Sequence, residues 1–343
     1  SQTPGELAGF TERARYMSDI AADALAPHRP QAVEGFDRSI EHVPLGVVAV
    51  LSPWNYPLLT SVNAIVPALM AGNVVILKPS HQTPLIAERY LLAADKTLPA
   101  GVLQALFLGH DLTAGLIADR DIDGVFFTGS VAGGIAVQKS LQNKFVPCGL
   151  ELGGKDPAYV RADADIEYAA ANLVDGAFFN SGQSCCGIER IYVHRQVYRP
   201  FVEAFVETTR QYRLGNPLQA DVNLGPRVKP GAADFVRGQL TAAQAAGARA
   251  LIDESLFPAS QPGTPDLAPQ VLVDVDHGMA LMREESFGPV VGIMPVDDDE
   301  QAVELMNDSD YGLTASFWTG DAEAVRNLGR LIATGTVFMN RCD

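Results

Sequence analysis

Cysteine is scarce in this sequence, with four residues among 343. So low a count excludes the disulfide scaffold on which small secreted domains rely. Two of the four, Cys185 and Cys186, are also direct neighbours. We therefore expect a protein of a reducing compartment, the cytoplasm.

Basic residues and long apolar runs are also few. Lysine and arginine number 25 against 41 aspartate and glutamate residues, which gives a formal net charge of −16. A field of that sign repels phosphate backbones and anionic headgroups, so neither nucleic acid nor a membrane is expected as a partner. The apolar run 46–51 is too short to cross a bilayer. Residues 1–7 lack a basic region followed by an apolar stretch, so no secretory leader is expected.

Apolar material is plentiful, at 47% of residues against 19% charged, which excludes a disordered chain and leaves enough for a sizeable core. The length predicts two domains. From Val47 onward, short β-branched runs alternate with helical stretches, which predicts an α/β fold with a doubly wound parallel sheet. The pattern restarts after residue 154, so we place a domain boundary near 153–155. Residues 32–45 alternate over short stretches and predict a hairpin or an extended arm.

The expected elements can be given by residue range. The expected strands are 47–51, 74–78, 102–108, 125–128, 156–160 and 190–194. The expected helices are 4–26, 58–71, 85–94, 112–118, 135–144, 164–178, 198–212 and 231–246.

The first candidate for chemistry is Cys185, in Asn180-Ser-Gly-Gln-Ser-Cys185-Cys186. A turn of glycine and polar residues lets backbone N–H groups face the sulfur or a bound oxyanion. A thiol needs such an electropositive, partly exposed environment to react as a thiolate. The alternative is a buried structural thiol. A shift of one residue is expected to point Cys186 elsewhere and to leave it a bystander.

The second candidate is Glu151, in Leu150-Glu151-Leu152-Gly153-Gly154-Lys155. A carboxylate in an apolar, strand-like run is costly to bury unless it is paired. Burial raises its pKa toward the range useful to a general base. The alternative is a strand-end glutamate in a salt bridge with Lys155.

Two further motifs follow predicted strands. Asn55, in Pro53-Trp54-Asn55-Tyr56-Pro57, lies at the strand edge where doubly wound sheets bind ligands, and its amide suits a developing oxyanion. A proline-bracketed turn is the alternative. The stretch Thr128–Gly134 runs from a strand through glycines to a helix, a geometry that suits pyrophosphate. Val131 breaks the Gly-x-Gly-x-x-Gly fingerprint, so a plain strand-to-helix turn is the alternative there.

From about Gly46 to Asn340, these motifs together make the sequence resemble the aldehyde dehydrogenase superfamily. The resemblance implies an aldehyde dehydrogenase-like α/β fold. In it, a Rossmann-type NAD(P)-binding domain would cover residues 1–153, and an α/β catalytic domain carrying the nucleophilic cysteine would cover 154–343.

The resemblance also implies a reaction, the NAD(P)-dependent oxidation of a small-molecule aldehyde to a carboxylic acid. Cys185 would attack the aldehyde and carry first a thiohemiacetal and then a thioester. Asn55 would stabilise the oxyanion, and Glu151 would activate the water that hydrolyses the thioester. No metal is expected.

Cofactor contacts are implied in the same way. Lys78 would reach the adenosine ribose, while Glu285 and Phe287 would hold the nicotinamide ribose and ring. The implied cofactor-binding set is Pro53, Trp54, Lys78, Ser80, His81, Gly129, Ser130, Gly133, Gly134, Leu152, Glu285 and Phe287. NAD-preferring relatives commonly carry a glutamate at the position of His81, where a carboxylate would repel the extra phosphate of NADP. NAD is therefore expected, with NADP left open.

The chain is shorter than family members at both ends, so the resemblance implies that it lacks their terminal segments. Residues 30–45 would form half of an oligomerisation arm, and the full-length protein would be a homodimer or homotetramer. Two other functions stay open. One is a CoA-acylating aldehyde dehydrogenase, against which Glu151 argues, and the other is a noncatalytic nucleotide-binding or interaction module.

Overall fold

A computed structural model describes residues 3–342 and divides the chain into two compact units. The first unit runs to Leu152 and the second begins at Gly153. The predicted α/β class is confirmed, because each unit is built on a sheet of largely parallel strands with helices packed against it. Among the described residues, no helix is both long enough and apolar enough to traverse a bilayer.

The sheet of the first unit has five parallel strands in the order β3-β2-β1-β4-β5. The strands are β1 (Val47–Leu51), β2 (Val74–Lys78), β3 (Leu103–Ala105), β4 (Gly124–Thr128) and β5 (Cys148–Glu151). The order runs outward from β1 in one direction to β3 and in the other to β5. The point between β1 and β4 is therefore the topological switch at which doubly wound sheets bind ligands.

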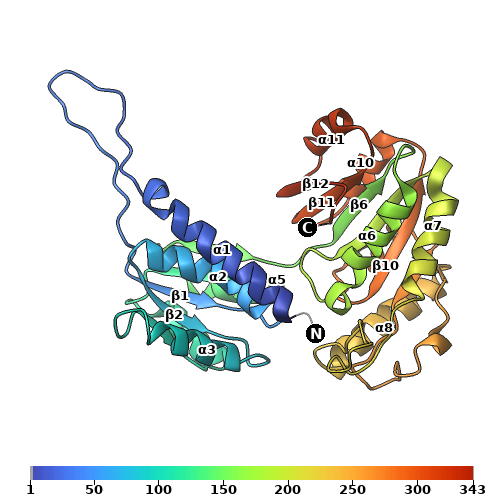
Figure 1. The fold of residues 1–343 in the computed structure, drawn as a ribbon, viewed down its shortest axis with the longest axis horizontal. Helices are drawn as coiled ribbons and strands as arrows, with labels where there is room; N and C mark the ends of the chain where they lie inside the picture. The colour runs from blue at the N-terminus through green and yellow to red at the C-terminus, as the bar shows by residue number, and fades with distance from the viewer. Residues whose placement is uncertain (1–2, 343) are drawn as a thin grey trace. The chain divides into compact units, whose positions relative to one another are not determined.

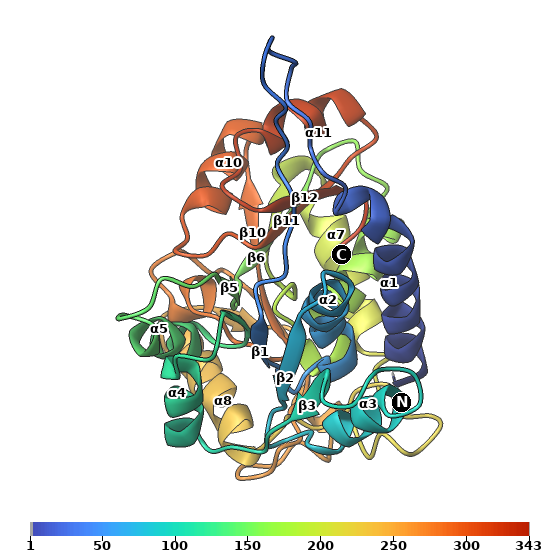
Figure 2. The same ribbon diagram turned by 90° about the vertical axis from the view of Figure 1, so that its left-hand side faces the viewer.

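Helices cover both faces of this sheet because its central strands are apolar on both sides. The helices are α1 (Thr3–Ala24), α2 (Pro57–Met70), α3 (Leu85–Ala94), α4 (His110–Ala118) and α5 (Val131–Ser140). Val48 and Val50 of β1 pack with α2 and α3, whereas Ala49 and Leu51 pack with α4 and α5. Figure 2 shows α4 and α5 on one side of the strands and α1, α2 and α3 on the other.

Between α1 and β1 the chain forms the long hairpin-like excursion that the alternating pattern of residues 32–45 predicts. Antiparallel bridges join His28 to Ile40 and Val33 to Phe36. The excursion extends away from the helices of its own unit (Figure 1). Phe36 is 71% exposed and Ile40 is 58% exposed. Its role in oligomerisation stays a prediction.

The second unit has a seven-stranded sheet in the order β12-β11-β6-β7-β10-β9-β8, parallel except for the β8–β9 pair. Its strands are β6 (Asp156–Val160), β7 (Ile188–His194), β8 (Arg249–Ala250), β9 (Gln270–Val273), β10 (Val290–Val296), β11 (Thr314–Trp318) and β12 (Thr336–Met339). Its helices are α6 (Ile166–Phe178), η1 (Phe179–Gly182), α7 (Arg195–Thr209), α8 (Pro230–Ala245), η2 (Glu254–Leu256), α9 (Ala280–Arg283), α10 (Asp299–Asn307) and α11 (Ala322–Gly329).

The core of the second unit also lies on both faces of its sheet. Ile191 and Val193 of β7 pack with α6 and α7 on one face. Between them in sequence, Tyr192 packs on the other face with α8, α9 and α10. Burial on both faces explains why the central strands are almost continuously apolar rather than alternating.

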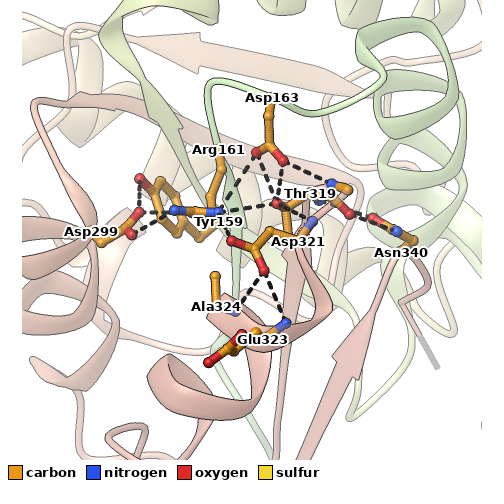
Figure 3. Close-up of polar contacts among 10 residues, drawn as sticks. Tyr159, Arg161, Asp163, Asp299, Thr319, Asp321, Glu323, Ala324 and Asn340 are labelled. Atoms are coloured by element: carbon orange, nitrogen blue, oxygen red, sulfur yellow. Dashed lines mark hydrogen bonds and ion pairs between the residues drawn. The ribbon is translucent and has the colours of Figure 1, made fainter.

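Polar side chains close the carboxyl edge of this second sheet. Arg161, just after β6, donates to both carboxylate oxygens of Asp299 at 2.9 Å each, and to Thr319 Oγ1 at 3.2 Å. Asp163 accepts from Thr319 Oγ1 at 2.8 Å, and Asp321 caps the first turn of α11 (Figure 3). The polar side chains at this edge are therefore hydrogen-bonded to one another.

Candidate active site

The predicted site residues of the first unit gather at the carboxyl edge of its sheet. Asn55 follows β1, Lys78 ends β2, and Glu151 ends β5. The register pairs Leu51 with Lys78 and Thr128 with Glu151, so these strand ends lie level. Sequence motifs spread over about a hundred residues thus meet at one edge of one sheet.

The glycine turn after β4 is shaped by the Phe127 ring and by Leu152. A Cβ atom on Gly129 or Gly133 would lie 2.5 or 2.6 Å from Phe127 Cζ, and one on Gly134 would lie 2.7 Å from Leu152 Cδ2. A side chain at any of these three positions would force Phe127 or Leu152 to move, so glycine lets both side chains pack against the turn.

Ser130 caps the helix that follows, accepting the Gly133 N–H on its Oγ at 3.2 Å. The expected start of this helix near Ile135 is wrong, because Ser130 caps a helix that begins at Val131, and Gly133 and Gly134 lie in its first turn. That first turn carries no acidic residue. The N–H groups at the start of α5, beside the switch point, fit the phosphates of a dinucleotide.

Lys78, Ser80 and His81 lie in sequence at the end of β2. Partial burial lowers the pKa of the Lys78 ammonium, and Lys78 ends β2 at the same edge of the sheet as the glycine turn. Ser80 Oγ accepts the Gln82 N–H at 3.2 Å. His81 is exposed, with its Nε2 3.0 Å from Gln82 Nε2. A cationic group and a hydroxyl at the same edge of the sheet as the start of α5 form a donor set that suits a nucleotide.

Pro53, Trp54 and Asn55 form the turn between β1 and α2. Pro53 is buried, while Trp54 and Asn55 are half-buried. The carboxylate of Glu6 on α1 accepts the N–H groups of Leu58 and Leu59 at 2.7 and 3.2 Å. It thereby anchors the start of α2 just after the Asn55 turn, a contact that no sequence motif predicts.

Glu151 is exposed, so the expectation that its strand buries it is wrong. The reason is that β5 is the outermost strand of the sheet. The salt bridge considered as the alternative is also wrong, since Lys155 Nζ instead donates to Glu189 Oε2 at 2.5 Å. Glu151 thus stands at a strand end as a solvent-accessible carboxylate.

In the second unit, the turn before Cys185 is built from backbone conformations that few residues adopt. Asn180, Ser181 and Gly182 have φ values of 50°, 58° and 68°, a left-handed turn directly before Gln183. Left-handed backbone costs free energy at residues other than glycine, so neighbouring groups must hold it. Ser181 Oγ donates to the Gly225 carbonyl at 2.6 Å.

Gln183 and Arg227 complete that support. Gln183 Oε1 accepts the Val228 N–H at 2.8 Å, and its Nε2 donates to the Asn180 carbonyl at 3.1 Å. Buried Arg227 donates to the Ser181 carbonyl at 3.2 Å, and desolvation lowers the pKa of its guanidinium to about 10. The segment that precedes α8 therefore fixes the turn that carries Cys185.

Cys185 is half-buried, with its Sγ 3.7 Å from Cys186 Sγ. The expectation that Cys186 points elsewhere is therefore wrong. The Cys186 thiol, as a hydrogen-bond donor, lowers the pKa of Cys185, and backbone N–H groups of both cysteines add to this. Burial and the charge of Asp156 act against it. The net direction favours the thiolate, the form that acts as a nucleophile.

Glu285 and Phe287 lie on the loop before β10. Glu285 Oε1 accepts the Gly154 N–H at 3.1 Å, and burial raises the pKa of this carboxyl to about 7. Phe287 has a φ of 49°. Glu285 is half-buried rather than part of an ordinary surface pair with Glu284, which is exposed.

The second unit collects these groups at the amino edge of its sheet, opposite to the edge drawn in Figure 3. Gly154 precedes β6, Cys185 precedes β7, and Glu285 precedes β10. Lys155 and Glu189, which join these segments, were missed as a pair by sequence reasoning. Their only signal was a charged residue at the start of each of two apolar strands. Within residues 3–342, no three histidine, cysteine or acidic side chains converge as a metal centre would require.

Comparison with known proteins defines the class. The model of the aldehyde dehydrogenase family matches residues 1–343, and the chain belongs to this family. It is 39% identical over 335 residues to a 4,4'-diapolycopene aldehyde oxidase of Methylomonas, covering 97% of this chain and 61% of that protein. The chain spans 61–65% of the length of the curated relatives it matches.

Solved structures agree. An NADP-dependent glyceraldehyde-3-phosphate dehydrogenase from Bacillus halodurans, complexed with NADP, has a TM-score of 0.89 and 34% identity, covering 98% of this chain and 70% of that one. A betaine aldehyde dehydrogenase from Staphylococcus aureus, in complex with NAD⁺, has a TM-score of 0.91 and 28% identity, covering 98% and 68%. The resemblance found in the motifs and the expected fold are confirmed.

Proposed function

We propose that this chain forms the core of an NAD(P)-dependent aldehyde dehydrogenase that oxidises an aldehyde to a carboxylic acid. The observation that carries the proposal is Cys185, a half-buried cysteine on a braced turn, whose pKa is lowered by a thiol and by backbone N–H donors. Membership of the family supports it, as do the aldehyde-oxidising relatives and the nicotinamide dinucleotides bound in the solved structures.

In this proposal Cys185 Sγ attacks the carbonyl carbon, and the carbonyl oxygen becomes an oxyanion. The Asn55 amide and the Cys185 backbone N–H donate to that oxygen. Losing one such donor typically costs about 3 kcal/mol of transition-state stabilisation. Bound NAD(P)⁺ supplies the hydride acceptor for this chemistry. Glu151 then takes a proton from water, which attacks the Cys185 thioester, and the acid leaves as Cys185 regains its thiolate.

Groups at the carboxyl edge of the first sheet fit the dinucleotide. The glycine turn and the N–H groups at the start of α5, whose first turn holds no acidic residue, suit its phosphates, and the Lys78 ammonium suits the adenosine ribose. We assign Pro53, Trp54, Ser80, His81 and Leu152 to the same nucleotide, with Glu285 and Phe287 at the nicotinamide end. His81 places no carboxylate against a 2′-phosphate, so NADP remains usable beside NAD.

We also propose that the hairpin-like arm between α1 and β1 pairs with another subunit in a homodimer or homotetramer. Its exposed Phe36 and Ile40, on a two-stranded excursion, support this. The proposed mechanism needs a reduced thiol, so we place the enzyme in the cytoplasm.

Reduced-nicotinamide formation across a panel of aldehydes tests the function, using NAD⁺ and NADP⁺ in the absence of CoA. Absorbance at 340 nm with at least one aldehyde supports hydrolytic oxidation. Activity that requires CoA instead supports acyl transfer to CoA. A folded protein that binds the dinucleotide but oxidises no aldehyde in either condition supports the noncatalytic module.

A further inference from the structure

A buried carboxylate, Glu189, lies four residues after Cys185 near the start of β7. Its Oε2 accepts from Lys155 Nζ at 2.5 Å and from the Ser286 N–H at 2.8 Å. Its Oε1 accepts the Phe287 N–H at 2.8 Å. Glu189 is 4% exposed and Lys155 1% exposed, so both charges are removed from water.

Three segments distant in sequence meet at this carboxylate. Lys155 follows Gly153-Gly154, and its ammonium donates to Ser286 Oγ at 3.1 Å as well as to Glu189. The Gly154 N–H in turn donates to Glu285. Glu285, Ser286 and Phe287 thus bond at three successive positions. Glu285 accepts from Gly154, Ser286 bonds to Lys155 and Glu189, and Phe287 donates to Glu189.

The stability of the fold does not by itself explain why Lys155 and Glu189 are buried as a charged pair. Removing two charges from water is costly, and apolar residues of similar volume often serve a core as well. An apolar pair, however, could not accept the N–H groups of Ser286 and Phe287. Phe287 has the left-handed φ of 49°, which costs free energy unless neighbours hold it. The loop 284–289 belongs to no helix or strand, so these bonds set its position.

We propose that Glu189 is a positioning residue for cofactor binding, with Lys155 as its counter-ion. It fixes Glu285 and Phe287 relative to the strand that begins just after Cys185. This inference rests on the proposed function, in which Glu285 and Phe287 hold the nicotinamide end of the dinucleotide. It predicts that the pair governs affinity for the dinucleotide and leaves the reactivity of the Cys185 thiol unchanged.

The test compares wild type with Glu189→Gln and with the double variant Lys155→Met/Glu189→Gln. The single variant leaves a buried ammonium without its carboxylate, which endangers folding. The double variant removes both charges together. Its glutamine carbonyl accepts only one of the two N–H groups, because the amide NH₂ is a donor.

Two readouts avoid turnover, namely equilibrium binding of NADH and NADPH by fluorescence and the rate of Cys185 alkylation by iodoacetamide without cofactor. For the double variant we expect dissociation constants about tenfold higher, as the loss of one or two hydrogen bonds implies. Alkylation should stay within about twofold of wild type. Phe201→Leu, a buried change in α7, controls for lost stability and should not alter dinucleotide affinity.

If the wild type binds the dinucleotide and the double variant binds it with the same affinity, Glu189 has no positioning role. The positioning role is also overturned if Phe201→Leu has the same melting temperature as the double variant and weakens dinucleotide binding by the same tenfold. If the wild type binds neither NADH nor NADPH, the proposed function fails first and the inference falls with it. The two failures are therefore told apart by the wild-type titration.

Discussion

The carboxylate of Glu285 accepts the backbone N–H of Gly154 at 3.1 Å, a contact that joins motifs 131 residues apart. The close approach requires glycine on the facing backbone, because a Cβ on Gly153 would collide with that carboxylate. The paired glycines after Glu151 therefore have a steric explanation. They let the loop before β10 reach the chain that enters β6.

Gly153→Ala should weaken dinucleotide binding about tenfold, because its methyl group must displace Glu285. Titration with NADH measures this. Gly238→Ala is the matched control, since nothing lies within 4 Å of a Cβ there, in the interior of α8. The control should stabilise the protein by about 0.5–1 kcal/mol without changing affinity. Equal affinity in wild type and Gly153→Ala would show that the Glu285 position is unimportant.

Cys185→Ala should abolish aldehyde oxidation, whereas Cys186→Ala should keep it. Loss of the Cys186 thiol removes the hydrogen bond that contributes most to the lowered pKa of Cys185. The pH profile of Cys185 alkylation should then move to higher pH, with a rate several-fold lower at neutral pH. Activity lost in Cys186→Ala but retained in Cys185→Ala would reverse the assignment of the nucleophile.

Asp156 should make stability depend on pH. Burial raises its pKa to about 7, against about 3.9 in an unfolded chain. The folded state thus binds more protons between these values, and stability falls as pH rises from about 4 to about 7, by about 4 kcal/mol at most.

Asp156→Asn should remove this dependence, because an amide can still meet Thr314, which donates to Asp156 through its N–H and Oγ1. Melting temperatures at pH 5 and pH 8 provide the check. The wild type should lose stability relative to the variant across this interval. A constant difference between the two proteins would mean that Asp156 does not titrate there.

His81→Glu should favour NAD⁺ over NADP⁺. A carboxylate at this exposed position, beside the end of β2, would repel a 2′-phosphate. We expect the NAD⁺-to-NADP⁺ ratio of binding constants to rise about tenfold, mainly through weaker NADP⁺ binding. The control is Gln82→Glu at the exposed neighbouring position, which shows whether any nearby negative charge raises this ratio. A ratio unchanged by His81→Glu would remove His81 from the cofactor site.

Much of the first unit could be predicted because its strands are short apolar runs separated by helices. The predicted 47–51 and 74–78 agree with β1 and β2 residue for residue, as does 156–160 with β6. The sequence interpretation assigned none of β8 to β12. Several of these are only two to four residues long and lie between irregular loops, so they leave too little periodicity to read.

Some residues of the candidate site could likewise be predicted from local sequence, and others could not. Cys185, Glu151 and Asn55 drew attention as polar residues in unusual local settings, but Glu285 and Phe287 were found only through the family resemblance. Glu189 and Lys155 could not be paired from sequence, because their partners lie 34 and 97 residues away. Exposure of Glu151 was also mispredicted, since local sequence does not reveal that β5 is an edge strand.

Mass spectrometry of Glu151→Gln tests whether Cys185 carries a thioester that Glu151 helps to hydrolyse. The variant is incubated with an aldehyde that the wild type oxidises, together with its dinucleotide, and then digested. We predict an acyl group on the peptide that carries Cys185, because the thioester forms but no carboxylate activates water to release it. Cys185→Ala/Glu151→Gln should show no acyl group. An unmodified Cys185 in the single variant, or wild-type turnover by that variant, would contradict this mechanism.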